Sequence, residues 1–240
     1  MIVSGAGASF DVDAIVFDKD GTLIDLDTTW LGITEAWVEA AGGGNPTRIA
    51  LLQAALGVDR RGFLVPGGVA ATGTFREIEY ATRQALNEAS AEVDRCIEEA
   101  RTMVASTIRD LPVAPIGDVE GSMRRLAAAG LVLCIASSDA EVTIQKHLDQ
   151  LGVADLISDM IGGDGLVAPK PHPASLTYLS DRVGIPVRRM LMVGDSYTDL
   201  GAARNAGAAG ILAVAPRNHS SPIGELCDGV IGSIQEIVVG

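Results

Sequence analysis

Residues 15–23, with the sequence IVFDKDGTL, constrain this chain more than any other stretch. A short apolar run delivers two acids at positions i and i+2, and a glycine and a threonine then turn the chain. Residues two apart in an extended strand project to the same side, so Asp18 and Asp20 are expected to face one reaction centre from a strand end. Two such carboxylates repel each other, and a cation bound between them relieves the repulsion. The stretch therefore predicts a metal site.

Length and charge restrict the class of protein. The 240 residues suffice for one large α/β domain or for a domain with a smaller insert. Aromatic residues make up only 4% of the chain and apolar residues 48%, so the core is expected to consist mainly of Ala, Val, Leu and Ile. The net charge of −13 argues against nucleic acid and anionic membranes as partners, because both require a basic surface.

The sequence contains no signal for a membrane or for secretion. No apolar run approaches the ~18 residues of a membrane span, and no basic segment precedes an apolar one at the N-terminus. The three cysteines, Cys96, Cys134 and Cys227, are scattered without metal-ligand spacing and are expected to be reduced. We therefore expect a cytoplasmic protein. Residues 5–9, GAGAS, precede the first strand instead of following one, so we interpret them as a flexible terminus and not as a nucleotide loop.

Residues 27–110 are predicted to form an all-helical insert. Helical spacing of apolar residues predicts one helix through Trp30 and Trp37, a second over 47–56, and one or two helices over 75–108, with Ser90 as a cap for the second of these. The two tryptophans lie seven residues apart and share a face. That face is either a packed core stripe or a ligand platform.

A glycine-rich loop, residues 62–74, interrupts the predicted helices of the insert. A loop of this length within a domain often has a function. Arg60, Arg61 and Arg76 flank it and either recognise a second anionic group on a substrate or remain exposed to solvent, as most arginines do.

Helices and strands alternate over the rest of the chain. Strands are predicted at 13–17, 131–136, 156–161, 189–193, 210–214 and 229–231, with helical segments between them. This alternation indicates an α/β fold with a doubly wound, Rossmann-like parallel sheet, whose functional loops lie at the carboxyl ends of the strands. Residues 1–26 and 111–240 are expected to form this core.

Three further strand ends carry polar groups. Residues 136–139, ASSD, place hydroxyl and backbone N–H groups at the start of a helix, which favours anion binding. Lys170 lies in a proline-rich segment, and residues 194–199, GDSYTD, contribute two acids at a strand-to-helix turn. Each feature alone has an ordinary explanation as a helix cap or a surface lysine. Together with residues 15–23, they predict that a hydroxyl, an ammonium and two acidic clusters meet in one crevice.

These four motifs, in this order, resemble the haloacid-dehalogenase-like hydrolase superfamily, specifically its helical-cap phosphatases and the phosphoglycolate-phosphatase-like group. The resemblance covers about residues 12–25 and 112–232. It implies a Mg²⁺-dependent phosphomonoester hydrolase that acts on a small phosphorylated metabolite, phosphoglycolate or a sugar phosphate, through an aspartyl phosphate. It also implies that residues 27–110 are a cap that closes on hinges near Asp25 and Leu111.

The resemblance assigns a role to each motif residue. Asp18 is the expected nucleophile, and Asp20 the expected acid and base. Mg²⁺ is expected to be bound by Asp18, the backbone carbonyl of Asp20, and Asp195. The groups expected to bind phosphate or support the turn are Thr22, Ser137, Ser138 and Lys170. Lys170 is also expected to stabilise the transition state, and Asp199 to orient Lys170 or the water around the metal.

Two alternative functions remain open on the sequence. A phosphomutase of the same fold would use a sugar hydroxyl in place of water, and the motifs do not separate it from a hydrolase. A non-catalytic phosphate-binding regulatory module would be favoured by loss of a motif acid or of Lys170, and none is lost. A dehalogenase is disfavoured, because halide displacement requires neither the Asp20 acid nor Mg²⁺.

Overall fold

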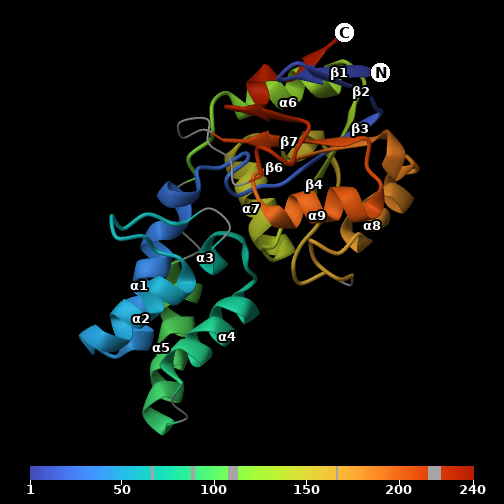
Figure 1. Ribbon diagram of the computed structural model, residues 1–240. Helices are drawn as coiled ribbons and strands as arrows, with labels where there is room; N and C mark the ends of the chain where they lie inside the picture. The colour runs from blue at the N-terminus through green and yellow to red at the C-terminus, as the bar shows by residue number, and fades with distance from the viewer. Residues whose placement is uncertain (66–67, 88–89, 108–112, 166, 216–222) are drawn as a thin grey trace. The chain divides into compact units, whose positions relative to one another are not determined.

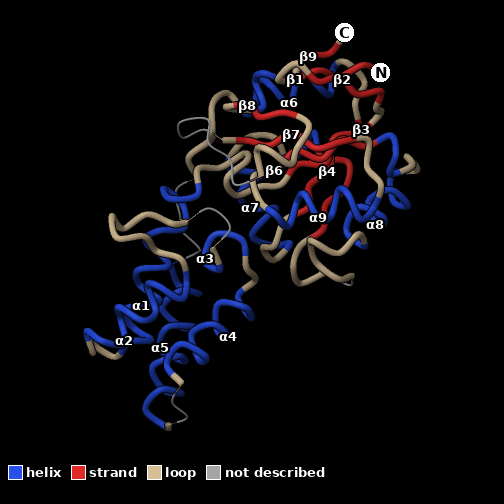
Figure 2. Tube along the Cα trace, viewed as in Figure 1, coloured by secondary structure: helices blue, strands red, loops and turns tan. Residues whose placement is uncertain are grey.

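The computed structural model describes residues 1–65, 68–87, 90–107, 113–165, 167–215 and 223–240. The chain divides into an α/β unit, Met1–Asp25 with Pro115–Gly240, and a helical unit, Leu26–Ala114 (Figures 1 and 2). The expected hinge at Leu111 lies outside the described residues. Within the described ranges, no helix is both long and apolar enough to cross a bilayer.

Six parallel strands form the main sheet of the α/β unit, which confirms the predicted doubly wound fold. In spatial order they are β5 (Ile157–Ile161), β4 (Val132–Ala136), β3 (Ala14–Phe17), β6 (Met190–Gly194), β7 (Gly210–Val214) and β8 (Gly229–Ile231). Ile15 at the centre of β3 lies beside Leu133 on one side and Leu191 on the other. The strand order reverses between β3 and β6, and a crevice opens at the carboxyl ends of strands where the order reverses.

Helices cover both faces of this sheet, as the continuous apolar strands require. On one face, alternate strand residues pack in a buried cluster with α8 (Ala174–Val183) and α9 (Tyr197–Ala206). On the other face lies α6 (Val119–Ala128), which contacts β4 (Figure 1). A further helix, α7 (Glu141–Gln150), connects β4 to β5.

The first eleven residues form a hairpin, so the prediction of a flexible terminus is wrong. β1 (Ile2–Gly5) pairs antiparallel with β2 (Ala8–Asp11), and β9 (Val238–Val239) pairs with β1. Ala6 and Gly7 have φ angles of 51° and 83°, as a type I′ hairpin turn requires. Gly7 of the GAGAS segment therefore makes a tight turn, and burial of Val3 and Phe10 stabilises the strands around it.

The helical unit consists of α1 (Gly32–Gly42), α2 (Pro46–Leu56), the short α3 (Val69–Thr72), α4 (Phe75–Leu86) and α5 (Ala91–Thr107), with a wide π-type turn over Asp27–Leu31 before α1. Thr74 and Glu77 form a reciprocal capping box at the start of α4. Ser90 Oγ accepts from the backbone N–H of Val93 at 3.3 Å, so the predicted cap between two consecutive helices is confirmed.

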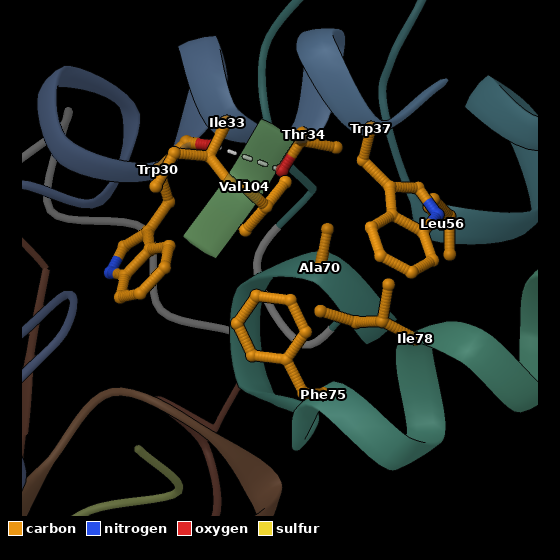
Figure 3. A pocket seen from close by; sticks show the side chains of 9 residues that line it. All are labelled: Trp30, Ile33, Thr34, Trp37, Leu56, Ala70, Phe75, Ile78 and Val104. Atoms are coloured by element: carbon orange, nitrogen blue, oxygen red, sulfur yellow. Dashed lines mark hydrogen bonds between the residues drawn. The ribbon is translucent and has the colours of Figure 1, made fainter. Parts of the chain in front are cut away.

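Trp30 and Trp37 belong to the core of the helical unit. Trp37 is 2% exposed, and its indole N–H donates to Thr82 Oγ1 at 2.9 Å. Figure 3 shows a small pocket beside the two tryptophans, with Thr34 Oγ1 bonded to the carbonyl of Trp30. Its volume is about 20 Å³, and a single water needs roughly 10–15 Å³ in such a cavity. The packed-core interpretation therefore holds, because this pocket is too small for a metabolite.

Candidate active site

The turns after β3 and β6 meet at the carboxyl edge of the sheet. Asp18 directly follows β3, and its backbone N–H donates to the carbonyl of Val193 in β6 at 2.8 Å. Gly21 then turns the chain with a φ of 81°. A Cβ on Gly21 would lie 2.2 Å from Asp195 Oδ2. Glycine at this position thus allows both the left-handed turn and the close approach of the acid that follows β6.

Lys170 lies between two buried carboxylates. Its Nζ donates to Asp18 Oδ1 at 2.6 Å and to Asp199 Oδ1 at 2.5 Å. The other oxygen of Asp199 accepts from Ser196 Oγ at 2.7 Å and from the backbone N–H groups of Ser196 and Asp195. Both oxygens of Asp199 are therefore held by donors of the protein. Asp199 therefore does two things. It orients Lys170, and it forms a capping box with Ser196 at the start of α9, as the helix-cap explanation of this acid predicts.

Asp18, Asp195 and Asp199 form an acidic group whose ligand atoms all lie within 4.8 Å of one another. Burial raises the pKa of Asp18 to about 7 against the opposing charge of Lys170, and loss of solvent contact raises the pKa of Asp195 well above its usual value. When ionised, the three carboxylates carry more negative charge than the one ammonium of Lys170 neutralises. A donor set made only of oxygens suits a hard divalent cation, so the residues fit Mg²⁺.

The side chain of Asp20 belongs to a second buried cluster, centred on Lys19. Lys19 is fully buried, and its Nζ lies 2.5 Å from Asp20 Oδ2 and 2.9 Å from Asp139 Oδ2. His147 Nδ1 also lies beside Nζ, at 3.1 Å. An ammonium only donates hydrogen bonds, so Nδ1 of His147 is the acceptor. Burial, together with the charge of Lys19, lowers the pKa of His147 to about 4, so the ring is neutral at pH 7.

The two acids of the first motif are therefore bound by different lysines. The sequence predicts that both face one centre, but the groups able to hold a metal divide into Asp18 with Asp195 and Asp199, and Asp20 with Asp139 and His147. Binding of Mg²⁺ through the backbone carbonyl of Asp20 stays a prediction. Sequence reasoning missed the roles of Asp139 and His147, whose spacing matches no motif.

The hydroxyl groups of the other motifs lie at the same edge. Ser137 Oγ accepts from the backbone N–H of Asp139 at 3.2 Å. It does not cap α7, whose N-cap residue is Ala140. Ser138 is half-buried beside it. Thr22 is fully buried in the turn after Asp20, and its hydroxyl has no hydrogen-bond partner within the described ranges.

The three arginines beside the glycine-rich loop are exposed on the helical unit. Arg61 bonds to Asp59 Oδ2 at 3.2 Å and lies over the ring of Phe63, with its guanidinium carbon 5.7 Å from the ring centroid. Arg60 and Arg76 are open to solvent. Recognition of an anionic substrate group by these residues stays a prediction, and residues 66–67 of the loop lie outside the described part of the chain.

Known proteins of similar sequence include the phosphoglycolate phosphatase of Vibrio vulnificus (strain CMCP6). That enzyme is 36% identical over 105 residues, which are 44% of this chain and 46% of the relative. The chain spans about half the length of the curated relatives that it matches.

Solved structures with the same fold match nearly the whole chain. A predicted phosphoglycolate phosphatase from Haemophilus somnus 129pt has a TM-score of 0.67 and 21% identity over 93% of this chain and 95% of its own. CbbY from Rhodobacter sphaeroides, in complex with phosphate, has a TM-score of 0.64 and 20% identity over 94% and 96%. The family model for haloacid dehalogenase-like hydrolases matches residues 12–207. As the four motifs predict, the chain belongs to the haloacid dehalogenase-like hydrolases.

Proposed function

We propose that this protein is a Mg²⁺-dependent phosphomonoester hydrolase that acts on a small phosphorylated metabolite. The observation that carries the proposal is the contact of Lys170 with Asp18 and Asp199, beside Asp195, at the carboxyl edge of β3 and β6. A buried ammonium next to a nucleophilic carboxylate favours the binding of a phosphoryl group. Similarity to phosphoglycolate phosphatases supports this substrate class.

Asp18 is the nucleophile in this mechanism. One of its oxygens attacks phosphorus, the bond to the ester oxygen breaks, and an aspartyl phosphate forms. Asp20 gives its proton to the leaving oxygen and then takes a proton from the water that attacks the aspartyl phosphate. That attack breaks the bond to Asp18 and releases phosphate. Bound by Asp18, Asp195 and the backbone carbonyl of Asp20, Mg²⁺ would supply neutralising charge.

The remaining motif residues bind and orient the phosphoryl group. Ser137 and Ser138 contribute hydroxyl and backbone N–H groups, and Lys170 offsets the charge that develops on the phosphoryl oxygens. Asp199 holds Lys170 in place for this purpose. Thr22 supports the turn after the nucleophile from its buried position.

The helical unit, Leu26–Ala114, is proposed to act as the cap that selects the leaving group. Its place in the sequence supports this role, because the insert lies between the motif of Asp18 and that of Ser137. Phosphoglycolate and sugar phosphates are the proposed substrates, and the cytoplasm is the proposed compartment.

A substrate screen tests the proposal. The protein is incubated with phosphoglycolate, sugar phosphates and nucleotides, with Mg²⁺ or with a chelator, and released phosphate and isomer exchange are measured. Release that depends on Mg²⁺ supports the hydrolase. Isomer exchange without net release identifies the mutase instead, and binding without turnover identifies the regulatory module.

A further inference from the structure

Lys19 has no role in the mechanism above, although it lies between the two acids of the first motif. Its side chain is fully buried. A buried ammonium is strongly destabilising unless it is paired and hydrogen-bonded. Burial of Lys19 therefore requires specific partners for its ammonium.

Those partners hold the ammonium from three separate segments. Asp20 lies in the turn after β3, Asp139 in the turn after β4, and His147 on α7. Lysine has three N–H donors, and an acceptor from each segment lies within 3.1 Å of Nζ. Hydrogen bonds to Asp20 and His147 and an ion pair with Asp139 hold the ammonium in place. The ammonium in turn holds the oxygen of Asp20 that it binds.

The charges in this cluster also suit a positioning role. Asp139 neutralises Lys19 from the side of β4, so the pair offers a hydrogen-bond donor to Asp20 with little net charge. Asp20, Asp139 and His147 are also a possible set of metal ligands. The ammonium of Lys19 already lies within hydrogen-bonding distance of all three, where a cation would have to bind.

We propose that Lys19 is a positioning residue: held by Asp139 and His147, it fixes the carboxylate of Asp20 for proton transfer to the leaving oxygen. This inference rests on the proposed function, in which Asp20 is the acid. Proton transfer requires the acid within hydrogen-bond reach of the ester oxygen, and a carboxylate without fixed partners can rotate away from it. Lys19 removes that freedom.

Esters that differ in their need for an acid give a direct test. A nitrophenolate leaves without protonation, whereas an alkoxide does not. The value of kcat/KM, which covers the steps through phosphoryl transfer, is measured for p-nitrophenyl phosphate and for the best alkyl phosphate in the screen, with Mg²⁺ present. General acid catalysis contributes roughly 10²–10⁴-fold, so Lys19→Met is expected to lose about 10²-fold on the alkyl ester and less than about 5-fold on the aryl ester.

Asp139→Asn gives a second, independent form of the test. It keeps the shape of the side chain but removes the negative charge that pairs with Lys19, so it is expected to show the same ester-selective pattern with a smaller loss. If Lys19→Met does not fold, this variant decides the question. The matched control is Lys146→Met, which removes a lysine outside the cluster and is expected to leave both esters unchanged.

Two results would overturn the inference: an equal loss on both esters in either variant, or no loss on the alkyl ester. Failure of the proposed function looks different, because the wild-type protein would then release no phosphate from either ester. Asp20→Asn gives the upper limit of the ester-selective loss. It removes the acid itself and is expected to show the largest difference between the two esters.

Discussion

Two buried lysines in the α/β unit are arranged alike, and their surroundings differ in charge. Lys170 contacts Asp18 and Asp199, and Lys19 contacts Asp20 and Asp139. Beside the first pair lies a further carboxylate, whereas beside the second lies the neutral ring of His147. With its acids ionised, the cluster of Lys170 therefore carries excess negative charge, and the cluster of Lys19 is closer to balance.

This difference gives adjacent acids of one turn separate environments. Enzymes assign different roles to two carboxylates by placing them in different environments. On the Lys170 side, the surplus of carboxylates favours a divalent cation, whose charge would keep the nucleophile ionised. On the Lys19 side, hydrogen bonds hold a carboxylate that moves a proton. The predictions below test this contrast, beginning with the largest expected effect.

Asp18→Asn is expected to have the largest effect of any single substitution. The amide keeps the shape of the side chain but is a far weaker nucleophile, so phosphate release from an aryl phosphate should fall by about 10⁴-fold or more. A phosphate-release assay with Mg²⁺ measures the loss. Asp155→Asn, on an exposed acid of the same unit, is the control and should keep wild-type activity. Retained activity in Asp18→Asn would refute the assignment of the nucleophile.

Mg²⁺ is expected to stabilise the wild-type protein through the cluster of Lys170. At a concentration about 100 times its dissociation constant, a ligand that binds only the folded state adds about 2.7 kcal/mol to the free energy of unfolding. Thermal unfolding with and without Mg²⁺ measures this gain. Asp195→Asn removes a carboxylate of that cluster and should lose most of it. An unchanged gain in Asp195→Asn would place the metal elsewhere.

Removing each lysine should separate the two clusters. Loss of one partner of a buried ion pair typically destabilises a protein by about 3–5 kcal/mol, so Lys170→Met and Lys19→Met should both show a loss of this order without metal. Mg²⁺ should restore much of the stability of Lys170→Met, because the cation replaces a positive charge there. It should restore little in Lys19→Met, where His147 offers nitrogen to a cation that prefers oxygen. Equal rescue would contradict the contrast.

The sequence predicts the cluster of Lys170 but not the cluster of Lys19. The partners of Lys170 all lie in motifs at strand ends, so the parallel sheet alone brings them together. The partners of Lys19 include His147, in the middle of α7, whose position depends on how that helix packs. A clue was the scarcity of lysine, with Lys19, Lys146 and Lys170 among 18 basic residues. Alternation of helix and strand predicts the main sheet, whereas the pairing of β1 with β9 joins segments far apart in the sequence, which no local pattern predicts.

His147 should give the smallest effect, a pH dependence of stability. Burial lowers its pKa in the folded protein to about 4, whereas the unfolded chain has the usual value of 6.5. The unfolded state therefore binds a proton first as the pH falls. The contribution of His147 to stability is fully present above pH 6.5 and is lost as the pH falls from 6.5 to 4. At pH 5 this loss amounts to at most about 2 kcal/mol.

The measurement is the free energy of unfolding by urea, in wild type and His147→Gln, between pH 7 and pH 5. Burial raises the pKa of Asp139 to about 6. Its effect on stability is opposite to that of His147, because the stability from Asp139 is lost as the pH rises from 3.8 to 6. Asp139 is present in both proteins, so the difference between their slopes isolates the histidine. Wild type should lose more stability than His147→Gln, and His172→Gln, at the start of α8, should keep the wild-type slope. Equal slopes in wild type and His147→Gln would mean that the ring is not held neutral against Lys19.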